Sequence, residues 1–504
     1  MTMIAFVNGT VVDGSGRAPY RGYVVCEGDR ILEVNGASPP RFESEIDCTG
    51  LTIAPGFLDL HSHSDLQALD GARLEKAKQG VTAELVGNCG FSPFPMNGHA
   101  AEARDFARGI FREDGDWGWQ SAGDYLAAAR SSSGAVEVHA LAGHGSLRVA
   151  VAGMRQRITA EHRTRMSALL EAALDDGCAG FSTGLMYAPG SSAGPREIEP
   201  FLALVTARDR LYATHMRSYS SGLIAALREQ IAMAQNTGCR IQISHLQAAG
   251  RANWPLVADA LGEIETARHG VDIEFDIYPY QCGSTVLTQW LPRWALDGGA
   301  DAMCQRLANE RDRRRIAEHI ESTIPQAWAD ITITGVRTEL NKALVGRTLA
   351  DIARRWAAEP VEAMLELLLQ ERGAVNVVSF NQGEENLRAL LTHPLCSVIS
   401  DGFYVRGVPH PRLHGTFPEL LGTVVREKKW MTLADAVHKI TAKPAARLGL
   451  KQCGLISPGY RADLVLFDAD RIASNATYEK PEQDPVGIAA VYRGGRLITG
   501  VETS

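Results

Sequence analysis

The sequence predicts an α/β protein: a (β/α)8 barrel of the TIM type with a small β-sandwich domain built from both chain termini. Apolar strand-like runs alternate with helical patterns through the middle of the chain, as in parallel α/β proteins. Several of these runs recur at about the 31-residue pitch of a barrel of ~250 residues. Both ends consist of short β-rich pieces divided by glycines. With 504 residues, the chain is long enough for roughly two to four domains.

The composition excludes several classes of protein. Hydrophobic residues make up 45% and charged residues 22%, which is ordinary for a globular protein with a large core. The net charge is -8 without a basic run, so nucleic acid is not an expected partner. We expect no membrane partner either, because no apolar run approaches ~20 residues and the N-terminus lacks the features of a secretory signal. Nine cysteines without paired spacing predict reduced thiols and a cytoplasmic location.

The two ends of the chain look alike. Residues 1–54 contain short strand-like pieces separated by glycine turns. In residues 449–504, the segments Asp463–Asp468 and Ala489–Ile498 have the pattern of strands, and the second contains a Gly-Gly turn. Two β-rich ends that flank one long middle favour a single sandwich assembled from both termini. Two separate terminal hairpins are the alternative.

Residues 55–448 are expected to form the barrel. Helical patterns such as Ala160–Asp176 and Gly222–Gly238 follow several of the strands. An open doubly wound sheet is the alternative, but no Gly-x-Gly-x-x-Gly turn follows an early strand to support it. The eight strands are expected to end near Leu60, Val86, Leu141, Phe181, Thr214, Ser244, Phe275 and Ile399.

Two connections are longer than a βα unit requires. The one after the second strand contains a predicted helical excursion over Asp105–Arg130. The one from Tyr280 to Ile399 needs an inserted subdomain, which we place near 284–345 and which contains the charged helix Asn309–Glu321. Such an insertion can cover the pocket of the barrel or lie on the surface without a role.

Metal-binding side chains recur at the predicted carboxyl ends of the strands, where barrel enzymes place their catalytic groups. Two of them stand at i and i+2 after the first strand and therefore leave the same face of the chain. A structural zinc site would use four closely grouped ligands, so ligands spread over five strands predict an open catalytic site. The side chains are His61 and His63 after the first strand, Cys89 after the second, His215 and His245 after the fifth and sixth, and Asp401 after the eighth.

These residues and their neighbours resemble the amidohydrolase superfamily, and within it the N-acyl-D-amino-acid deacylases (D-aminoacylases). Many hydrolases of the superfamily bridge two metals with a carboxylated lysine on strand 4, but strand 4 here, Gly180–Leu185, has none. In the D-aminoacylase group a cysteine after strand 2 does this, and Cys89 stands at that place. The matching phrases are Pro55–Asp65, Gly87–Gly90, Gly143–Arg148, Phe181–Tyr187, Tyr212–Arg217, Ser244–Leu246, Asp276–Tyr280, Ser400–Gly402, His410–Arg412, Gly415–Pro418 and Pro458–Val465.

The resemblance implies zinc-dependent hydrolysis of a linear amide bond, with an N-acyl-D-amino acid or a related N-acyl compound as the small-molecule substrate. Asp401 would be the general base that takes a proton from the attacking water and later donates it to the leaving amine. Zinc would lower the pKa of this water and polarise the scissile carbonyl. The implied ligands are Cys89, His215 and His245 for one tightly bound ion, and His61 and His63, sharing Cys89, for a second, weaker one.

Five further residues are candidates for substrate binding. Arg412 can bind a carboxylate with two hydrogen bonds, and a salt bridge within its loop is the alternative. Tyr187 and Tyr278 can donate hydrogen bonds to the same carboxylate, or can be ordinary buried tyrosines. His144 can polarise the scissile carbonyl or support the site from behind. The fifth candidate is Gln247.

Two positions depart from the family's pattern. Gln247 follows Ser-His-Leu, where the family usually has a lysine, so hydrogen bonding is kept and the positive charge is lost. The segment Met216–Ser220 lacks the acidic residue expected after its arginine. Both changes weaken the expectation of an ordinary D-amino acid. The alternatives are a cyclic-amide hydrolase of the hydantoinase or dihydroorotase kind and a catalytically silent barrel, and the oligomeric state stays open.

Overall fold

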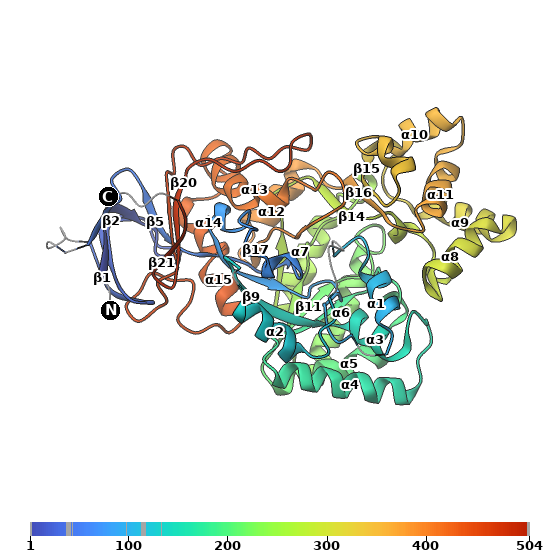
Figure 1. Cartoon of the computed structure of the whole chain (residues 1–504), viewed down its shortest axis with the longest axis horizontal. Coiled ribbons are helices and arrows are strands. Elements are labelled where there is room, and N and C mark those ends of the chain that lie inside the picture. Colours follow the sequence, from blue (N-terminus) through green and yellow to red (C-terminus); the bar gives the residue numbers. More distant parts are fainter. Residues whose placement is uncertain are drawn as a thin grey trace.

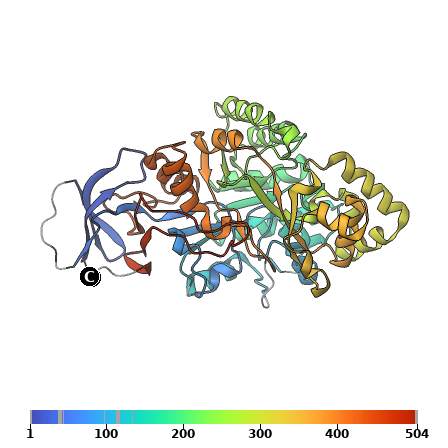
Figure 2. The ribbon, with the colours of Figure 1, turned by 90° about the horizontal axis from the view of Figure 1, so that it is seen from above.

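The structure is a computed structural model that describes residues 3–36, 42, 44–96, 98–111, 117–132 and 134–500. A barrel lies in the middle of the molecule, with a sheet formed by the chain ends on one side and an inserted unit on the other (Figure 1). The view from above shows the same order (Figure 2). Within the described ranges, no helix is both long enough and apolar enough to cross a membrane.

The centre of the chain forms a nearly closed, parallel sheet of eight strands. Its strands are short and almost wholly buried, as expected when helices cover a parallel sheet. Each strand ends within three residues of the position predicted from the sequence, which confirms the barrel prediction. In the order of the sheet, the strands are β17 (Cys396–Val398), β13 (Ile273–Ile277), β12 (Arg240–Ile243), β11 (Leu211–His215), β10 (Gly180–Gly184), β9 (Glu137–Gly143), β8 (Val81–Val86) and β6 (Phe57–Asp59).

The first and last strands of the barrel are joined just beyond their ends. Strand β7 (Ser62–His63) pairs in parallel with β18 (Gly402–Phe403). A buried ammonium group, Nζ of Lys76, lies 2.7 Å from Oδ2 of Asp59 and 2.6 Å from the hydroxyl of Ser400. Because a buried charge is stable only when it is paired and hydrogen-bonded, this contact ties the two edges of the barrel together.

Helices follow the barrel strands on the outside. Helix α4 (Ala160–Asp175) begins at Thr159, whose hydroxyl accepts a hydrogen bond from the amide of His162, and it buries Met166 and Leu170. This helix and α6 (Leu223–Thr237) confirm two helices predicted from the sequence. The predicted excursion over 105–130 contains the end of α1 and most of α2, while residues 112–116 lie outside the described part. The other helices around the barrel are α1 (Ala100–Ala107), α2 (Ala122–Ser131), α3 (His144–Ala152), α5 (Pro195–Ala207), α7 (Leu256–Ala267), α12 (Glu384–Thr392), α13 (Arg412–Glu419), α14 (Leu433–Lys439) and α15 (Ala442–Arg447).

Between β13 and β17 the chain leaves the barrel and forms a unit with its own hydrophobic core, which extends from Leu287 to Val377. Its sheet has the order β14-β16-β15, and both pairings are antiparallel. The range predicted for the insertion, 284–345, covers the first part of this unit. Its elements are β14 (Cys282–Val286), α8 (Gly299–Ala308), α9 (Glu310–Thr323), β15 (Ile331–Val336), α10 (Leu349–Trp356), α11 (Pro360–Gln370) and β16 (Val375–Phe380).

Both ends of the chain meet in one eight-stranded sheet. The antiparallel pairing of β5 with β19 joins the N-terminal and C-terminal parts, so the alternative of two separate hairpins is wrong. The predicted turn at Gly494-Gly495 connects β20 with β21. The strands are β1 (Met3–Val11), β2 (Tyr20–Glu27), β3 (Arg30–Asn35), β4 (Glu45–Asp47), β5 (Thr52–Pro55), β19 (Leu464–Phe467), β20 (Ile488–Arg493) and β21 (Arg496–Gly500).

Candidate active site

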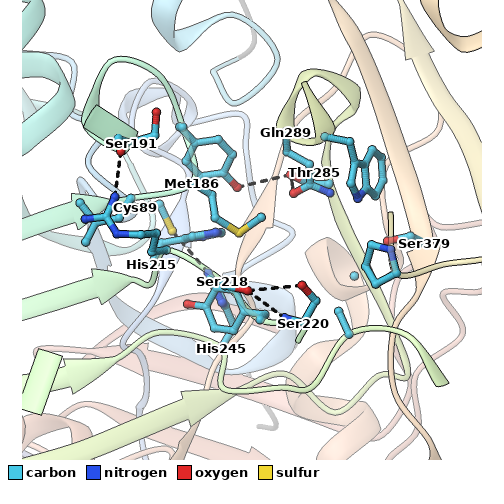
Figure 3. Close-up of a pocket in the computed structure, with 18 of the residues that line it drawn as sticks. Cys89, Met186, Ser191, His215, Ser218, Ser220, His245, Thr285, Gln289 and Ser379 are labelled. Atoms are coloured by element: carbon cyan, nitrogen blue, oxygen red, sulfur yellow. Dashed lines mark hydrogen bonds between the residues drawn. The ribbon is translucent and has the colours of Figure 1, made fainter. Parts of the chain in front are cut away.

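The side chains predicted to bind a metal converge at the carboxyl ends of the barrel strands. Sγ of Cys89 lies 3.4 Å from Nε2 of His61 and 3.5 Å from Nε2 of His245. The rings of His215 and His245 are neighbours, with centroids 4.6 Å apart. Figure 3 shows Cys89, His215 and His245 gathered on one side of a pocket. Residues more than 150 positions apart in the sequence thus share one small volume.

Asp401 belongs to the same cluster. Its Oδ1 lies 3.4 Å from Nε2 of His61 and 3.4 Å from Nε2 of His63. Its Oδ2 lies 2.9 Å from Nη2 of Arg412. Two groups of three residues have their ligand atoms within 4.8 Å of one another, and they share one histidine: His61, Cys89 and His245, and His61, His63 and Asp401.

Several buried ring nitrogens of this cluster have no hydrogen-bond partner among the described residues. They are both nitrogens of His215 and the Nδ1 atoms of His61, His63 and His245. An unpaired buried polar atom destabilises the folded protein by about 1–3 kcal/mol, so a cation that accepts the lone pairs of these imidazoles would stabilise it. Imidazole and thiolate are the ligands that zinc prefers. The set of donors around Cys89 therefore fits a zinc ion.

Burial and nearby charges set the ionisation of the cluster. Burial lowers the pKa of His245 to about 4 and lowers the pKa of His215 well below its usual value, so both rings are neutral, as metal ligands must be. Burial raises the pKa of the Cys89 thiol to about 11, so a cation is needed to hold it as a thiolate. Burial alone would raise the pKa of Asp401, but the guanidinium of Arg412 holds it far below its usual range. Asp401 is therefore ionised.

Three residues of the cluster have backbone angles in the left-handed region, which residues other than glycine rarely adopt. The φ angles are 54° at Cys89, 35° at His245 and 47° at Asp401. Each of these residues stands two or three positions after the end of a barrel strand. Strain of about 1–3 kcal/mol at such a residue persists only where the surrounding structure enforces it, and this occurs mostly at functional sites.

Asp276, in β13, contacts two of the histidines and was given no role by the sequence. Its Oδ1 accepts a hydrogen bond of 2.6 Å from the backbone amide of His245 and lies 3.6 Å from Nδ1 of His61. Its Oδ2 accepts a hydrogen bond of 2.9 Å from Nε2 of Gln242. A carboxylate at this place orients the ring of His61 and fixes the backbone at His245. The sequence did contain a signal for Asp276, since this residue stands near the end of a predicted strand and opens Asp276–Tyr280, one of the segments that resemble the family.

A cavity of about 650 Å³ opens over the metal-binding side chains. Its size and its mixture of aromatic and polar walls suit a small molecule. Thr285, Gln289 and Ser379, which come from the inserted unit, lie across the pocket from the histidines (Figure 3). The insertion therefore covers the pocket. On the barrel side the cavity is lined by His63, Cys89, His215, His245 and Asp401, and further lining residues of the insertion include Trp290, Arg293 and Gln326.

Four of the five candidates for substrate binding lie at or beside this cavity. Tyr187, Gln247 and Tyr278 line it. The guanidinium of Arg412 lies 4.5 Å from the centre of the Tyr278 ring and is buried. The amide oxygen of Gln247 accepts hydrogen bonds from the hydroxyl of Tyr278 at 3.4 Å and from Nδ2 of Asn381 at 3.1 Å.

The remaining candidate, His144, lies apart from the cavity lining. Its Nε2 is 3.0 Å from Oε1 of Glu197, which also contacts the guanidinium of Arg148 at 2.5 Å. A methyl group added at Gly190 would come within 3.6 Å of Nδ1 of His144, so the ring packs against the turn that follows Tyr187. In this structure His144 therefore contacts a buried ion pair and a loop.

Arg217, which has no acidic neighbour in the sequence, finds its carboxylate on another element. Its Nε and Nη2 lie 3.1 Å from the two carboxylate oxygens of Glu229 in α6. The carbonyl oxygens of Ser191 and Ala193 accept further hydrogen bonds of 2.8 and 2.7 Å from its guanidinium. The charge of this cavity-lining arginine is therefore satisfied within the protein.

Comparisons with known proteins agree with this geometry. The model of the Amidohydrolase family matches residues 44–499. An N-acyl-D-glutamate deacylase from Alcaligenes xylosoxydans xylosoxydans is 34% identical over 496 residues, which cover 97% of this chain and 91% of the relative.

Two solved structures resemble the chain over nearly its whole length. One is the N-acyl-D-glutamate deacylase of Bordetella bronchiseptica, complexed with zinc and a phosphonate inhibitor that mimics the tetrahedral intermediate (TM-score 0.83, 32% identity, 98% of this chain and 96% of that chain). The other is a D-aminoacylase with a binuclear metal centre (TM-score 0.84, 30% identity, 99% of this chain and 97% of that chain). The chain therefore belongs to the amidohydrolase family, within its D-aminoacylase group.

Proposed function

We propose that the protein is a zinc-dependent deacylase that hydrolyses the linear amide bond of an N-acyl-D-amino acid or a close N-acyl relative. One observation carries the proposal. Cys89, His215 and His245 meet beside Asp401 at the floor of a cavity of small-molecule size. Three relatives that match nearly the full length, at 31–34% identity, are deacylases of N-acyl-D-glutamate and N-acyl-D-aspartate and a D-aminoacylase.

The residues of the cluster divide into two sets of ligands. Cys89, His215 and His245 would hold the tightly bound zinc ion, and His61 and His63, together with Cys89, a second and weaker one. When bound, zinc polarises the scissile carbonyl and lowers the pKa of a water molecule to about 7. Burial of these side chains and the unpartnered ring nitrogens support metal binding at the cluster.

Asp401 acts as the general base and then as the general acid. Its carboxylate is ionised, lines the cavity and faces His61 and His63, so it can accept a proton from the attacking water. The same group then donates the proton to the leaving amine. The hydrogen bond of 2.8 Å from its backbone amide to the carbonyl of His61 fixes its position across the closure of the barrel.

Arg412 binds the carboxylate of the substrate. Its Nε and Nη1 atoms are buried and have no hydrogen-bond partner among the described residues, so the guanidinium keeps a free donor for a carboxylate. Tyr278 packs against the guanidinium, and the Tyr187 hydroxyl, now 3.3 Å from the hydroxyl of Thr285, can donate to the substrate. His144 acts indirectly, by supporting the turn after Tyr187.

Gln247 favours an uncharged side chain on the substrate. The glutamine joins an uncharged network, because Asn381 donates to it and in turn accepts hydrogen bonds from Gln326 at 2.8 Å and from Ser379 at 2.9 Å. None of these four side chains carries a charge that would attract an acidic group. We therefore expect neutral D-amino acids to be better substrates than D-glutamate or D-aspartate derivatives.

A substrate screen tests the proposal. The zinc-loaded protein is incubated with N-acetyl derivatives of D- and L-amino acids and, in parallel, with hydantoins and dihydroorotate. We expect acetate to be released from the D-derivatives alone. Hydrolysis confined to the cyclic compounds would overturn the proposal, and the cyclic-amide alternative is disfavoured because the full-length relatives named above are deacylases.

The domain boundaries are also proposals. Residues 1–54 and 449–504 would form one sandwich-like domain, residues 55–448 the barrel, and the part near 284–345 an insertion. The core shared by the two ends supports this division, since the rings of Phe6 and Tyr492 lie 4.9 Å apart. The cytoplasmic location and the absence of nucleic-acid and membrane partners stay predictions.

A further inference from the structure

A second cavity, of about 100 Å³, adjoins the catalytic cavity on the side of Tyr187. We call it the acyl chamber. The two cavities share four lining residues: Ile110, Met186, Tyr187 and Gln289. The walls of the chamber come from the turn after β8, from α1 and from the inserted unit, and its apolar side chains include Phe91, Phe106, Met154, Val286, Leu296 and Met303.

The walls of the acyl chamber are apolar and packed. The rings of Phe91 and Phe106 are stacked with centroids 4.4 Å apart, and Phe91 also packs against Tyr187 at 5.3 Å. Charged side chains at the chamber are paired, since Asp105 contacts Arg108 and Asp301 contacts Arg372. The interior therefore suits a hydrocarbon group.

The position of the chamber indicates which end of the substrate reaches it. Asp401 follows β17, whereas Met186 and Tyr187 follow β10, and four steps separate β17 from β10 in the sheet of eight strands. These residues therefore lie on opposite sides of the barrel mouth. Asp401 must meet the leaving amine, so the acyl group on the other side of the scissile bond extends toward Tyr187 and the chamber.

We propose that the acyl chamber binds the acyl chain of the substrate and that the protein prefers N-acyl-D-amino acids with chains longer than acetyl. This inference rests on the proposed function. Because a group of the size of a water molecule fills about 30 Å³, the chamber holds roughly three carbon atoms beyond the acetyl methyl, which corresponds to a pentanoyl group. Each added methylene is expected to raise kcat/KM about fourfold, because this factor corresponds to the free energy gained when one methylene group is buried.

A chain-length series tests the proposal. The zinc-loaded enzyme is assayed on acetyl, propanoyl, butanoyl, pentanoyl and decanoyl derivatives of one neutral D-amino acid. We expect kcat/KM to rise on the order of 50-fold from acetyl to pentanoyl and not beyond. A preference for acetyl with a steady fall toward longer chains would overturn this inference and leave the proposed function intact. Failure to cleave any member would overturn both.

Variants in and beside helix α8 show whether the preference for longer acyl chains arises at the chamber. Ala300 lines the chamber, so Ala300→Phe fills it and should bring the ratio of pentanoyl to acetyl kcat/KM close to one. Ala308, at the exposed end of the same helix, provides the matched control, and Ala308→Phe should keep the wild-type ratio. Leu296→Ala enlarges the chamber and should lengthen the acyl chain that gives the highest kcat/KM by one or two carbons. An unchanged ratio in Ala300→Phe would contradict the proposal.

Discussion

Arg412→Met is expected to remove most of the enzyme's preference for a free carboxylate. In the structure, Nη2 of Arg412 contacts Asp401 at 2.9 Å, while Nε and Nη1 are buried and lack hydrogen-bond partners among the described residues. The Nε and Nη1 hydrogens leave different edges of the guanidinium, so one carboxylate accepts from one of these atoms, and a hydrogen bond to a charged group contributes about 1.5–3 kcal/mol. This corresponds to a loss of roughly 10- to 150-fold in kcat/KM.

The assay compares two substrates, because Arg412→Met also removes the ion-pair partner of Asp401. That second effect slows every substrate to the same degree. The ratio of kcat/KM for an N-acyl-D-amino acid to kcat/KM for its carboxamide therefore isolates the carboxylate contact. We expect the ratio to fall about 10- to 150-fold in Arg412→Met.

Arg412→Lys is the matched control for this prediction. It keeps the positive charge but loses the planar pair of donors, so its ratio should lie between those of the wild type and Arg412→Met. If Arg412→Met slows the acid and the carboxamide by the same factor, Arg412 does not bind the substrate carboxylate, and its role is confined to Asp401.

Three other predictions follow from the same contacts. Asp401→Asn should retain zinc and lose about 10²–10⁴-fold in kcat; normal turnover with a normal zinc content would exclude its role as general base. Gln247→Lys should raise kcat/KM for an N-acyl-D-glutamate relative to an N-acyl-D-leucine about tenfold or more, measured by competition between the two; an unchanged ratio would contradict our account of the uncharged network. Burial would raise the pKa of Glu197, but His144 and Arg148 hold it at about 2, below the usual 4.5. Its contribution to stability, about 3 kcal/mol, is therefore present above pH 4.5 and lost as the pH falls toward 2. In urea unfolding, Glu197→Gln should have a lower free energy of unfolding than the wild type at pH 7, and the difference should shrink below pH 5. A difference that does not change with pH would show that the charge of Glu197 does not stabilise the protein.

Local patterns of the sequence were sufficient to predict the barrel and its cluster. Buried parallel strands are short apolar runs, and the runs ending near Leu60, Val86 and Ile399 all became barrel strands. Because parallel strands present their carboxyl ends at one edge, side chains that follow them are brought together, as Cys89 and His245 are.

Features that depend on contacts between distant segments were not predictable. Val375–Phe380 is an apolar run like those of the barrel, and only tertiary pairing places it between β14 and β15. His144 contacts Glu197, 53 positions away, and no local pattern marks that pair. The left-handed backbone at Cys89 and Asp401 is likewise enforced by the surroundings, since neither residue type favours it strongly.

X-ray absorption at the zinc edge of the active holoenzyme is the most direct test of the metal centre. We predict one sulfur ligand at about 2.3 Å and imidazole nitrogens at about 2.0–2.1 Å. The sulfur contribution should disappear in Cys89→Ser. A zinc spectrum in the wild type with nitrogen and oxygen ligands alone would contradict the assignment of Cys89, and with it the centre that we build around His215 and His245.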